Sequence, residues 1–201
     1  LPQTPLRADL ASRAPVLAVT TGEYVGDVFH ERIHVIDLDR ARLRSVAPLL
    51  PSMRDFMLDP QGRYALVTDW PEGDPSSTAQ LVDLIGQGRR CSKFTFGAGE
   101  VVASTAIAAD GSTAWYYLQL PQRRGRLLRW DLDNCSELIH VDVQQGSTLP
   151  TLLTLDDGVW AYRQAGEALT WFGSDGQRRD LTAAQLDRSM QQFALSRDGQ
   201  R

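Results

Sequence analysis

The sequence predicts an all-β protein, a β-propeller of four-stranded antiparallel blades with about four blade equivalents. Two repeating markers predict this fold, together with apolar side chains on both sides of the expected strands. The first marker is an Asp-Gly or Asp-x-x-Gly turn after the first strand of a unit. It recurs at 59–62, 110–111, 157–158 and 198–199. Short apolar runs bounded by such turn residues are typical of strands joined in a meander.

The second marker is an aspartate that closes the third strand of a unit. It occurs at Asp37, Asp83 and Asp131, each time directly after an apolar run. Both markers recur about every 40–50 residues, which is the length of one propeller blade. Two independent markers that share one period indicate that the same structural unit is repeated.

The period divides the chain into an N-terminal extension, residues 1–15, and a propeller domain, residues 16–201. The expected blade units are 16–47, 53–96, 102–143 and 150–181, and residues 190–196 repeat a first strand. In this division the first unit has no first strand of its own. Either the C-terminal strand completes it and closes a small ring, or the chain is part of a larger ring. A short helix is expected only at 182–191.

The pattern inside the strands favours a propeller over a two-layer sandwich. A sandwich strand turns one face to solvent, so that apolar and polar residues alternate along it. In 33–36 and 127–132, both alternating sets contain large apolar residues. A blade is covered on both faces by its neighbours, so burial on both sides is expected of it. A sandwich of regular meanders is the alternative.

Composition limits the functions that the chain can have. The hydrophobic content of 42% and the charged content of 23% are ordinary for a globular protein. The net charge of −4 does not favour nucleic acid as a partner. No apolar run approaches the roughly 18–20 residues that span a bilayer, so membrane insertion is not expected. No metal, nucleotide or nucleophile motif occurs, and no cofactor is expected.

The two cysteines, Cys91 and Cys135, allow at most one disulfide. They occupy equivalent positions in neighbouring units. Such positions are usually farther apart than the narrow Cα separation that a disulfide needs. A disulfide and two free thiols therefore both remain open, and the cysteines do not decide the redox compartment.

Four segments carry a resemblance to a known family. They are 32–39 (RIHVIDLD), 109–117 (ADGSTAWYY), 126–133 (RLLRWDLD) and 193–200 (FALSRDGQ). They resemble bacterial YVTN-type β-propellers and, among these, the heavy chain of quinone-cofactor amine dehydrogenases. The resemblance implies a periplasmic or secreted subunit of a seven-bladed ring, about half of it present here, that scaffolds a small quinone-bearing light chain. The motifs specify the blade and not the chemistry, so no active-site residue is carried over.

The connections after the second strands are longer than the other turns and share one end of the blades. They are 21–31, 70–77, 119–124 and 163–166. Long loops on a rigid scaffold are where binding residues gather. The residues expected to contact a partner protein subunit or a small ligand are Tyr24, Phe29, His30, Trp70, Asp74, Arg123, Arg124 and Arg163. Solvated loop tips without a partner are the alternative.

Two functions follow from these features. The first is a non-catalytic scaffold or recognition subunit that binds a partner protein, most specifically one like an amine dehydrogenase heavy chain. The second is a lactonase-type enzyme with an active site at the propeller axis. The polar residues that the first strands offer there are Arg54, Asp55, Ser104, Thr105, Thr151 and Thr154. They contain no clear acid–base set.

Histidines and aromatic residues on strands have structural explanations. His34 and His140 are expected to be hydrogen-bonded core histidines, whereas His30 lies in a long connection. One histidine near carboxylates is weak support for a metal site. The aromatic row at 115–117 is expected to pack between blades.

Overall fold

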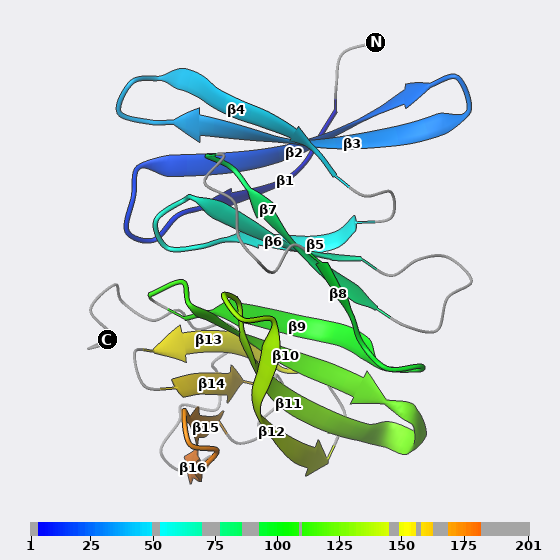
Figure 1. Ribbon diagram of the computed structural model, residues 1–201, viewed down its shortest axis with the longest axis vertical. Helices are drawn as coiled ribbons and strands as arrows, with labels where there is room; N and C mark the ends of the chain where they lie inside the picture. The colour runs from blue at the N-terminus through cyan, green and yellow to red at the C-terminus, as the bar shows by residue number, and fades with distance from the viewer. Residues whose placement is uncertain are drawn as a thin grey trace, which may run out of the picture. The chain divides into compact units, whose positions relative to one another are not determined.

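The computed structural model describes residues 4–49, 53–69, 77–85, 93–108, 110–144, 149–155, 158–162 and 169–181. Within these ranges the chain forms four antiparallel sheets, each of four strands that are consecutive in the sequence (Figure 1). The chain divides into two compact units, Leu1–Ala98 and Gly99–Arg201, and each unit contains two of the sheets. The predicted four-stranded meanders are therefore confirmed.

The first unit contains the sheets β1–β4 and β5–β8. The strands of the first sheet are β1 (Thr4–Leu10), β2 (Val16–Val25), β3 (Val28–Asp37) and β4 (Arg42–Pro48). Those of the second are β5 (Met53–Leu58), β6 (Tyr64–Asp69), β7 (Thr78–Asp83) and β8 (Lys93–Thr95). Figure 1 shows the two sheets as successive layers.

One core joins the two sheets of the first unit. Because side chains alternate along a strand, every second residue of β2 and β3 points at the second sheet. Those residues include Val16, Ala18, Ile33 and Val35, all of them buried. They belong to the same apolar cluster as residues of β5, β6 and β7 (Phe56, Leu58, Ala65, Val67, Val82).

Strand β1 lies within the segment that was expected to be an N-terminal extension. It pairs antiparallel with β2, with Leu10 opposite Leu17 and Ala8 opposite Val19. The first sheet therefore has its own first strand, and the expectation that this position is empty is wrong. The segment 190–196, expected to repeat a first strand, and the expected helix at 182–191 lie outside the described residues.

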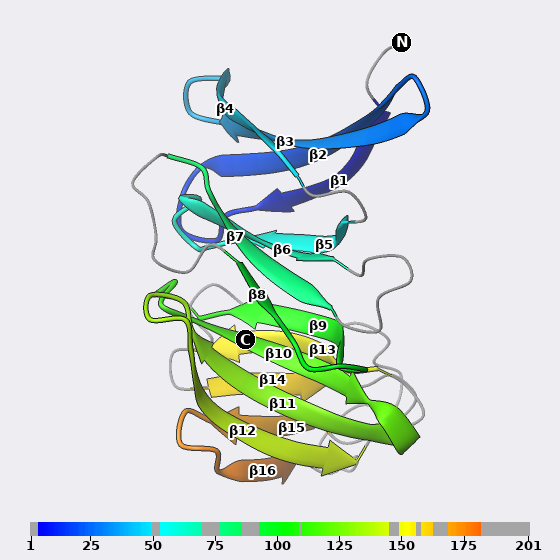
Figure 2. The ribbon, with the colours of Figure 1, turned by 45° about the vertical axis from the view of Figure 1, so that its right-hand side comes forward.

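The second unit contains the sheets β9–β12 and β13–β16. The first of them consists of β9 (Val101–Ile107), β10 (Thr113–Leu120), β11 (Arg124–Asp131) and β12 (Ser136–Gln144), with the 3-10 turn η1 (Pro121–Arg123) between β10 and β11. The other consists of β13 (Thr151–Leu155), β14 (Gly158–Tyr162), β15 (Leu169–Gly173) and β16 (Arg178–Leu181). Figure 2 shows these two sheets as neighbouring layers.

The aromatic row on β10 is fully buried, as expected. Trp115 and Tyr117 point at the last sheet and share a core with Leu152, Val159 and Phe172. Tyr116 points to the opposite face of the same strand, yet it is also completely buried. Burial raises the pKa of its hydroxyl well above the usual value. Both faces of β10 are therefore removed from water.

Hydrogen bonds between first strands tie the two sheets of each unit together. In the first unit, Leu58 N donates to Asp9 Oδ2 at 2.7 Å, and Arg7 forms an ion pair with Asp55 at 2.8 Å. In the second unit, Thr154 Oγ1 donates to the Ile107 carbonyl at 2.5 Å. Polar contacts between the first strands thus join the two sheets in both units.

The repeated aspartates have a common physical role, because each accepts backbone N–H groups of the turn that follows it. Asp59 accepts from Tyr64 N at 2.8 Å, and Asp110 accepts from Ser112 N at 2.9 Å. Asp83 accepts from Ile85 N at 3.0 Å, and Asp131 accepts from Asn134 N at 2.8 Å. The two sequence markers are therefore turn caps.

The difference in burial between two of these caps predicts a difference in stability. Asp59 is 1% exposed and accepts several backbone N–H groups, whereas the Asp110 cap lies at the surface. Asp59→Ala leaves buried donors without an acceptor and is expected to lower the free energy of unfolding by about 2–4 kcal/mol. Asp110→Ala is expected to cost about 1 kcal/mol or less, because water replaces its carboxylate. Urea denaturation of both variants checks this, and equal losses contradict it.

Asp9 predicts a pH dependence of stability. Desolvation by burial raises its pKa above the ordinary value, against the hydrogen bonds from Leu58 N and Leu10 N. The folded protein therefore holds the Asp9 proton more tightly than the unfolded chain, and stability falls as the pH rises from about 4 through the folded pKa. Asp9→Asn is expected to remove this fall, so that its stability relative to the wild type increases between pH 3 and pH 7.

Asp131 is the control for this experiment because its pKa shifts in the opposite direction. The hydrogen bond from the Asn134 side chain lowers the pKa of Asp131. Its contribution to stability is present above the unfolded pKa and disappears as the pH falls. Asp131→Asn is therefore expected to lose stability relative to the wild type as the pH rises. Urea titrations at each pH measure both differences, and the same sign for both variants contradicts the assignment.

Candidate functional site

The β2–β3 hairpin contains the first of the predicted contact segments. The sequence predicted a loop at 21–31, and this is wrong: β2 and β3 are ten residues each and pair as far as Val25 opposite Val28. Gly26, with φ of 64°, and Asp27 form the turn between them. Figures 1 and 2 both show this hairpin, in blue, reaching past the ends of β5 and β6.

Gly22 explains why the strand continues where the sequence indicated a loop. A Cβ atom at this position would lie 2.2 Å from Cζ of Phe29 and 3.1 Å from Cδ1 of Leu6. The Phe29 ring therefore lies over the glycine and covers its backbone, as aromatic residues do beside glycines in sheets. Gly22 gives room for a ring and does not break the strand.

The end of this hairpin exposes large apolar side chains. Tyr24 is 69% exposed, Val25 58% and Val28 56%. Tyr24 and Phe29 form a cross-strand pair with ring centroids 4.9 Å apart and a tilt of 50°. We call Tyr24, Val25, Val28 and Phe29 the hairpin tip.

Polar residues fix the hairpin below its tip. Arg32 forms an ion pair with Glu23 at 3.4 Å, across the strand pair. His34 Nε2 lies 2.8 Å from Thr21 Oγ1, which confirms the predicted hydrogen bond. The residue is half-buried and does not lie in the core, where it was predicted. His30 is exposed and lies on the strand next to Phe29. The tip is therefore held on a rigid, paired stem.

The second unit carries a shorter connection at the equivalent place. Between β10 and β11 only Pro121–Arg123 lie outside the strands. Gln122 and Arg123 have positive φ angles of 64° and 58°. Arg123 and Arg124 are both exposed, next to each other at this turn. The predicted loop is thus a tight turn with two adjacent arginines.

The remaining predicted contact residues, Trp70, Asp74 and Arg163, lie outside the described residues. So does Cys91, for which the sequence leaves a disulfide with Cys135 and a free thiol both open. Cys135 itself is disulfide-bonded and has a positive φ of 56° in the turn between β11 and β12.

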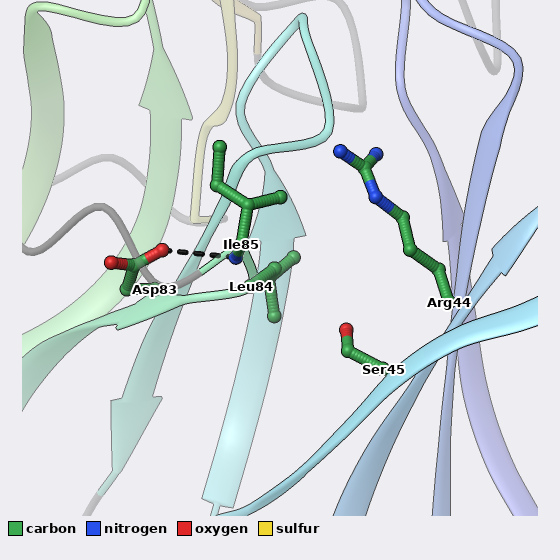
Figure 3. Close-up of a pocket in the computed structure, with 5 residues that line it drawn as sticks. All are labelled: Arg44, Ser45, Asp83, Leu84 and Ile85. Carbon is green, nitrogen blue, oxygen red and sulfur yellow. Dashed lines mark hydrogen bonds between the residues drawn. The ribbon is translucent and has the colours of Figure 1, made fainter.

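A hollow that the sequence did not predict lies at the other end of the strands, between β4 and the end of β7. It has a volume of about 500 Å³ and is lined by Arg44, Ser45, Asp83, Leu84 and Ile85. Figure 3 shows Arg44 and Ser45 on one side of it and Leu84 and Ile85 on the other. It is an open hollow at the surface and not an enclosed cavity.

No group of three or more His, Cys, Asp or Glu side chains in the residues that the structure describes could hold a metal ion. No helix in that part of the chain is long and apolar enough to cross a membrane. His140 is 52% exposed in its side chain and contacts Glu137 at 2.5 Å, so the expectation of a core histidine is wrong there.

Comparison with known proteins identifies the fold. No family model and no curated protein sequence matches the chain. Among solved structures, it is similar to the β-propeller domain of the Trilobed protease from Pyrococcus furiosus, which has an open velcro topology. The TM-score is 0.65 at 9% identity, over 89% of this chain and 57% of that one. The chain has the β-propeller fold.

Two further structures agree. The acylaminoacyl peptidase of Pyrococcus horikoshii matches with a TM-score of 0.63 at 8% identity, over 89% of this chain and 32% of the peptidase. The RRP9 WD40 repeats match with a TM-score of 0.58 at 10% identity, over 90% of this chain and 52% of that one. The match therefore spans about half the length of the two propeller chains and about a third of the peptidase. Each described sheet is one propeller blade.

The first strands of the blades carry the polar residues considered for an axial active site. Asp55 forms the ion pair with Arg7, and Ser104 Oγ accepts a hydrogen bond from Leu152 N at 3.2 Å. Thr154 donates to Ile107, as described above. These three side chains connect neighbouring blades of the propeller, which is a structural use of them.

Proposed function

We propose that this β-propeller is a recognition domain that binds a partner protein through the hairpin tip. The observation that carries the proposal is the exposure of Tyr24, Val25 and Val28, each more than half in water. Clustered exposed apolar side chains are typical of contact sites. Tyrosine is enriched in such sites because it combines apolar area with a hydroxyl.

The stem of the hairpin supports this role. Tyr24 is exposed and stacks on the half-buried Phe29, on strands that are already paired. Such a pair loses little conformational entropy on binding, because the backbone is already ordered. Tyr24 and Phe29 lie on one face of the hairpin, and Val25 and Val28 lie on the other. The expected partner surface is therefore an apolar cleft that receives both faces of the tip.

The more specific form of the proposal is a subunit like the heavy chain of a quinone-cofactor amine dehydrogenase, in the periplasm or secreted. The segments that carry this resemblance form blade strands. Residues 32–39 include much of β3, and residues 126–133 include much of β11. Any propeller needs such strands, so these residues support the blade more than the chemistry. A light-chain partner remains one candidate for the protein that the tip binds.

Site-specific photo-crosslinking tests the proposal. With p-benzoylphenylalanine in place of Tyr24, irradiation in the source cell is expected to yield a discrete adduct with a single protein. Leu138, 46% exposed on β12, is the matched control position and is expected to yield none. Val28→Asp in the Tyr24-substituted protein is expected to reduce the adduct severalfold, with stability changed by about 0.5 kcal/mol or less because the site is exposed. An adduct that is equal at both positions, or that is unaffected by Val28→Asp, contradicts the proposal.

A further inference from the structure

The hollow between β4 and β7 owes its lining to an irregularity in strand pairing. Val35 pairs with Ser45, but the adjacent Ile36 pairs with Leu43, so Arg44 is an extra residue in β4. In a regular strand, neighbouring side chains point to opposite faces. At a β-bulge the extra residue is turned out of that alternation. Arg44 and Ser45 therefore line the same hollow (Figure 3).

A bulge of the same kind occurs in the second unit, but with a different residue at it. In the second unit, Arg129 pairs with Ile139 and Trp130 pairs with Glu137, so Leu138 is the extra residue of β12. A bulge at this place thus occurs in the fourth strands β4 and β12. In β4 it carries a guanidinium, and in β12 it carries an aliphatic side chain.

Both polar groups on the β4 side lack a partner among the described residues. The Ser45 hydroxyl is buried and makes no hydrogen bond. A buried hydroxyl without a partner costs free energy, so a hydrogen-bond acceptor at this place would be favourable. Arg44 forms no ion pair within the described chain, although other arginines such as Arg7, Arg63 and Arg126 do. Within the described residues, an exposed guanidinium without an ion pair and a hydroxyl without a hydrogen bond thus belong to the lining of one hollow.

The opposite wall selects the kind of anion. Leu84 and Ile85 supply apolar surface, and Leu84 is fixed by donation of its N–H to the Arg63 carbonyl at 2.9 Å. Asp83 adds one negative charge and accepts a hydrogen bond from Ile85 N. A carboxylate on this wall repels a dianion such as phosphate more strongly than a monoanion. A guanidinium matches the two oxygens of a carboxylate.

We propose that this hollow binds a monoanionic carboxylate that carries an aliphatic group. The carboxylate lies against the Arg44 guanidinium and accepts a hydrogen bond from the Ser45 hydroxyl, and the aliphatic group lies against Leu84 and Ile85. A free small acid and the C-terminus of a peptide that ends in an aliphatic residue share this chemistry. The site is separate from the hairpin tip, because it lies at the other end of the β3 strand.

Titration of the full chain with N-acetyl-leucine, followed by NMR, tests the proposal. Chemical shifts of Ser45, Leu84 and Ile85 are expected to change in a saturable way. Arg44→Gln is expected to weaken binding by about 10- to 100-fold, because it removes a charge-assisted pair. Arg42→Gln, which removes the same charge two residues earlier on the same strand, is expected to leave binding unchanged. Binding of Ala-Ala-Ala-Leu with similar affinity identifies the peptide C-terminus as the source, and binding of the free acid alone identifies a small acid.

Ser45→Ala distinguishes binding from a structural role. Because the hydroxyl is buried and unpaired, its removal is expected to leave the thermal midpoint unchanged or raised, while binding falls several-fold. The proposal is overturned by any of four results: no saturable shift at 10 mM ligand, equal binding of N-acetyl-leucinamide, tighter binding of inorganic phosphate, or equal losses in the Arg42 and Arg44 variants.

Discussion

Burial of both faces of the inner strands is the constraint on which the rest of this structure depends. All six residues of β6 are buried, as are the first six of β10. Since successive side chains point to opposite faces, a sheet with such strands cannot leave either face in water. The second sheet of the same unit covers one of these faces with a shared apolar core. The fourth strands β4 and β12 lack this burial, with most of their residues exposed.

The decrease in burial from inner to outer strands explains where the two candidate sites lie. Substitutions on β6 or β10 change a packed core and are expected to cost several kcal/mol. The end of the β2–β3 hairpin and the bulge in β4 lie outside that core, so their residues can vary with little loss of stability. Both candidate sites, the hairpin tip and the hollow at Arg44, are at such places. The fold positions these residues, but its stability does not depend on their identity.

Much of the fold could be predicted from the sequence because the repeated aspartates act locally. Asp59, Asp83, Asp110 and Asp131 each bond the turn that directly follows, so the spacing of the residues reveals the spacing of the turns. A strand such as β10 has apolar residues on both faces, so its burial can be predicted from its own sequence. The propeller fold could be predicted because such local features recur in successive blades.

What could not be predicted depends on contacts between distant segments. Strand β1 has little apolar alternation, and polar contacts to Asp55 and Leu58 hold it in place. Gly22 lies in a segment that the sequence predicts as a loop. It is a strand residue instead, covered by the Phe29 ring of the partner strand, and such a contact cannot be seen in one segment alone. The hollow at Arg44 depends on a bulge and on two sheets meeting, and no motif in the sequence marks either. Of the candidate site, the sequence therefore predicted Tyr24 and Phe29 but neither Arg44 nor Ser45.

Hydroxyl-radical footprinting of the β10 aromatic row tests two-sided burial most directly. Tyr116 and Tyr117 are adjacent and point to opposite faces, and Tyr24 on the hairpin serves as the exposed reference within the same chain. The account predicts that Tyr116 and Tyr117 are both oxidised at a small fraction of the rate of Tyr24. Rapid oxidation of one of the two neighbours, with protection of the other, would show a sheet with one face in water and would contradict the account.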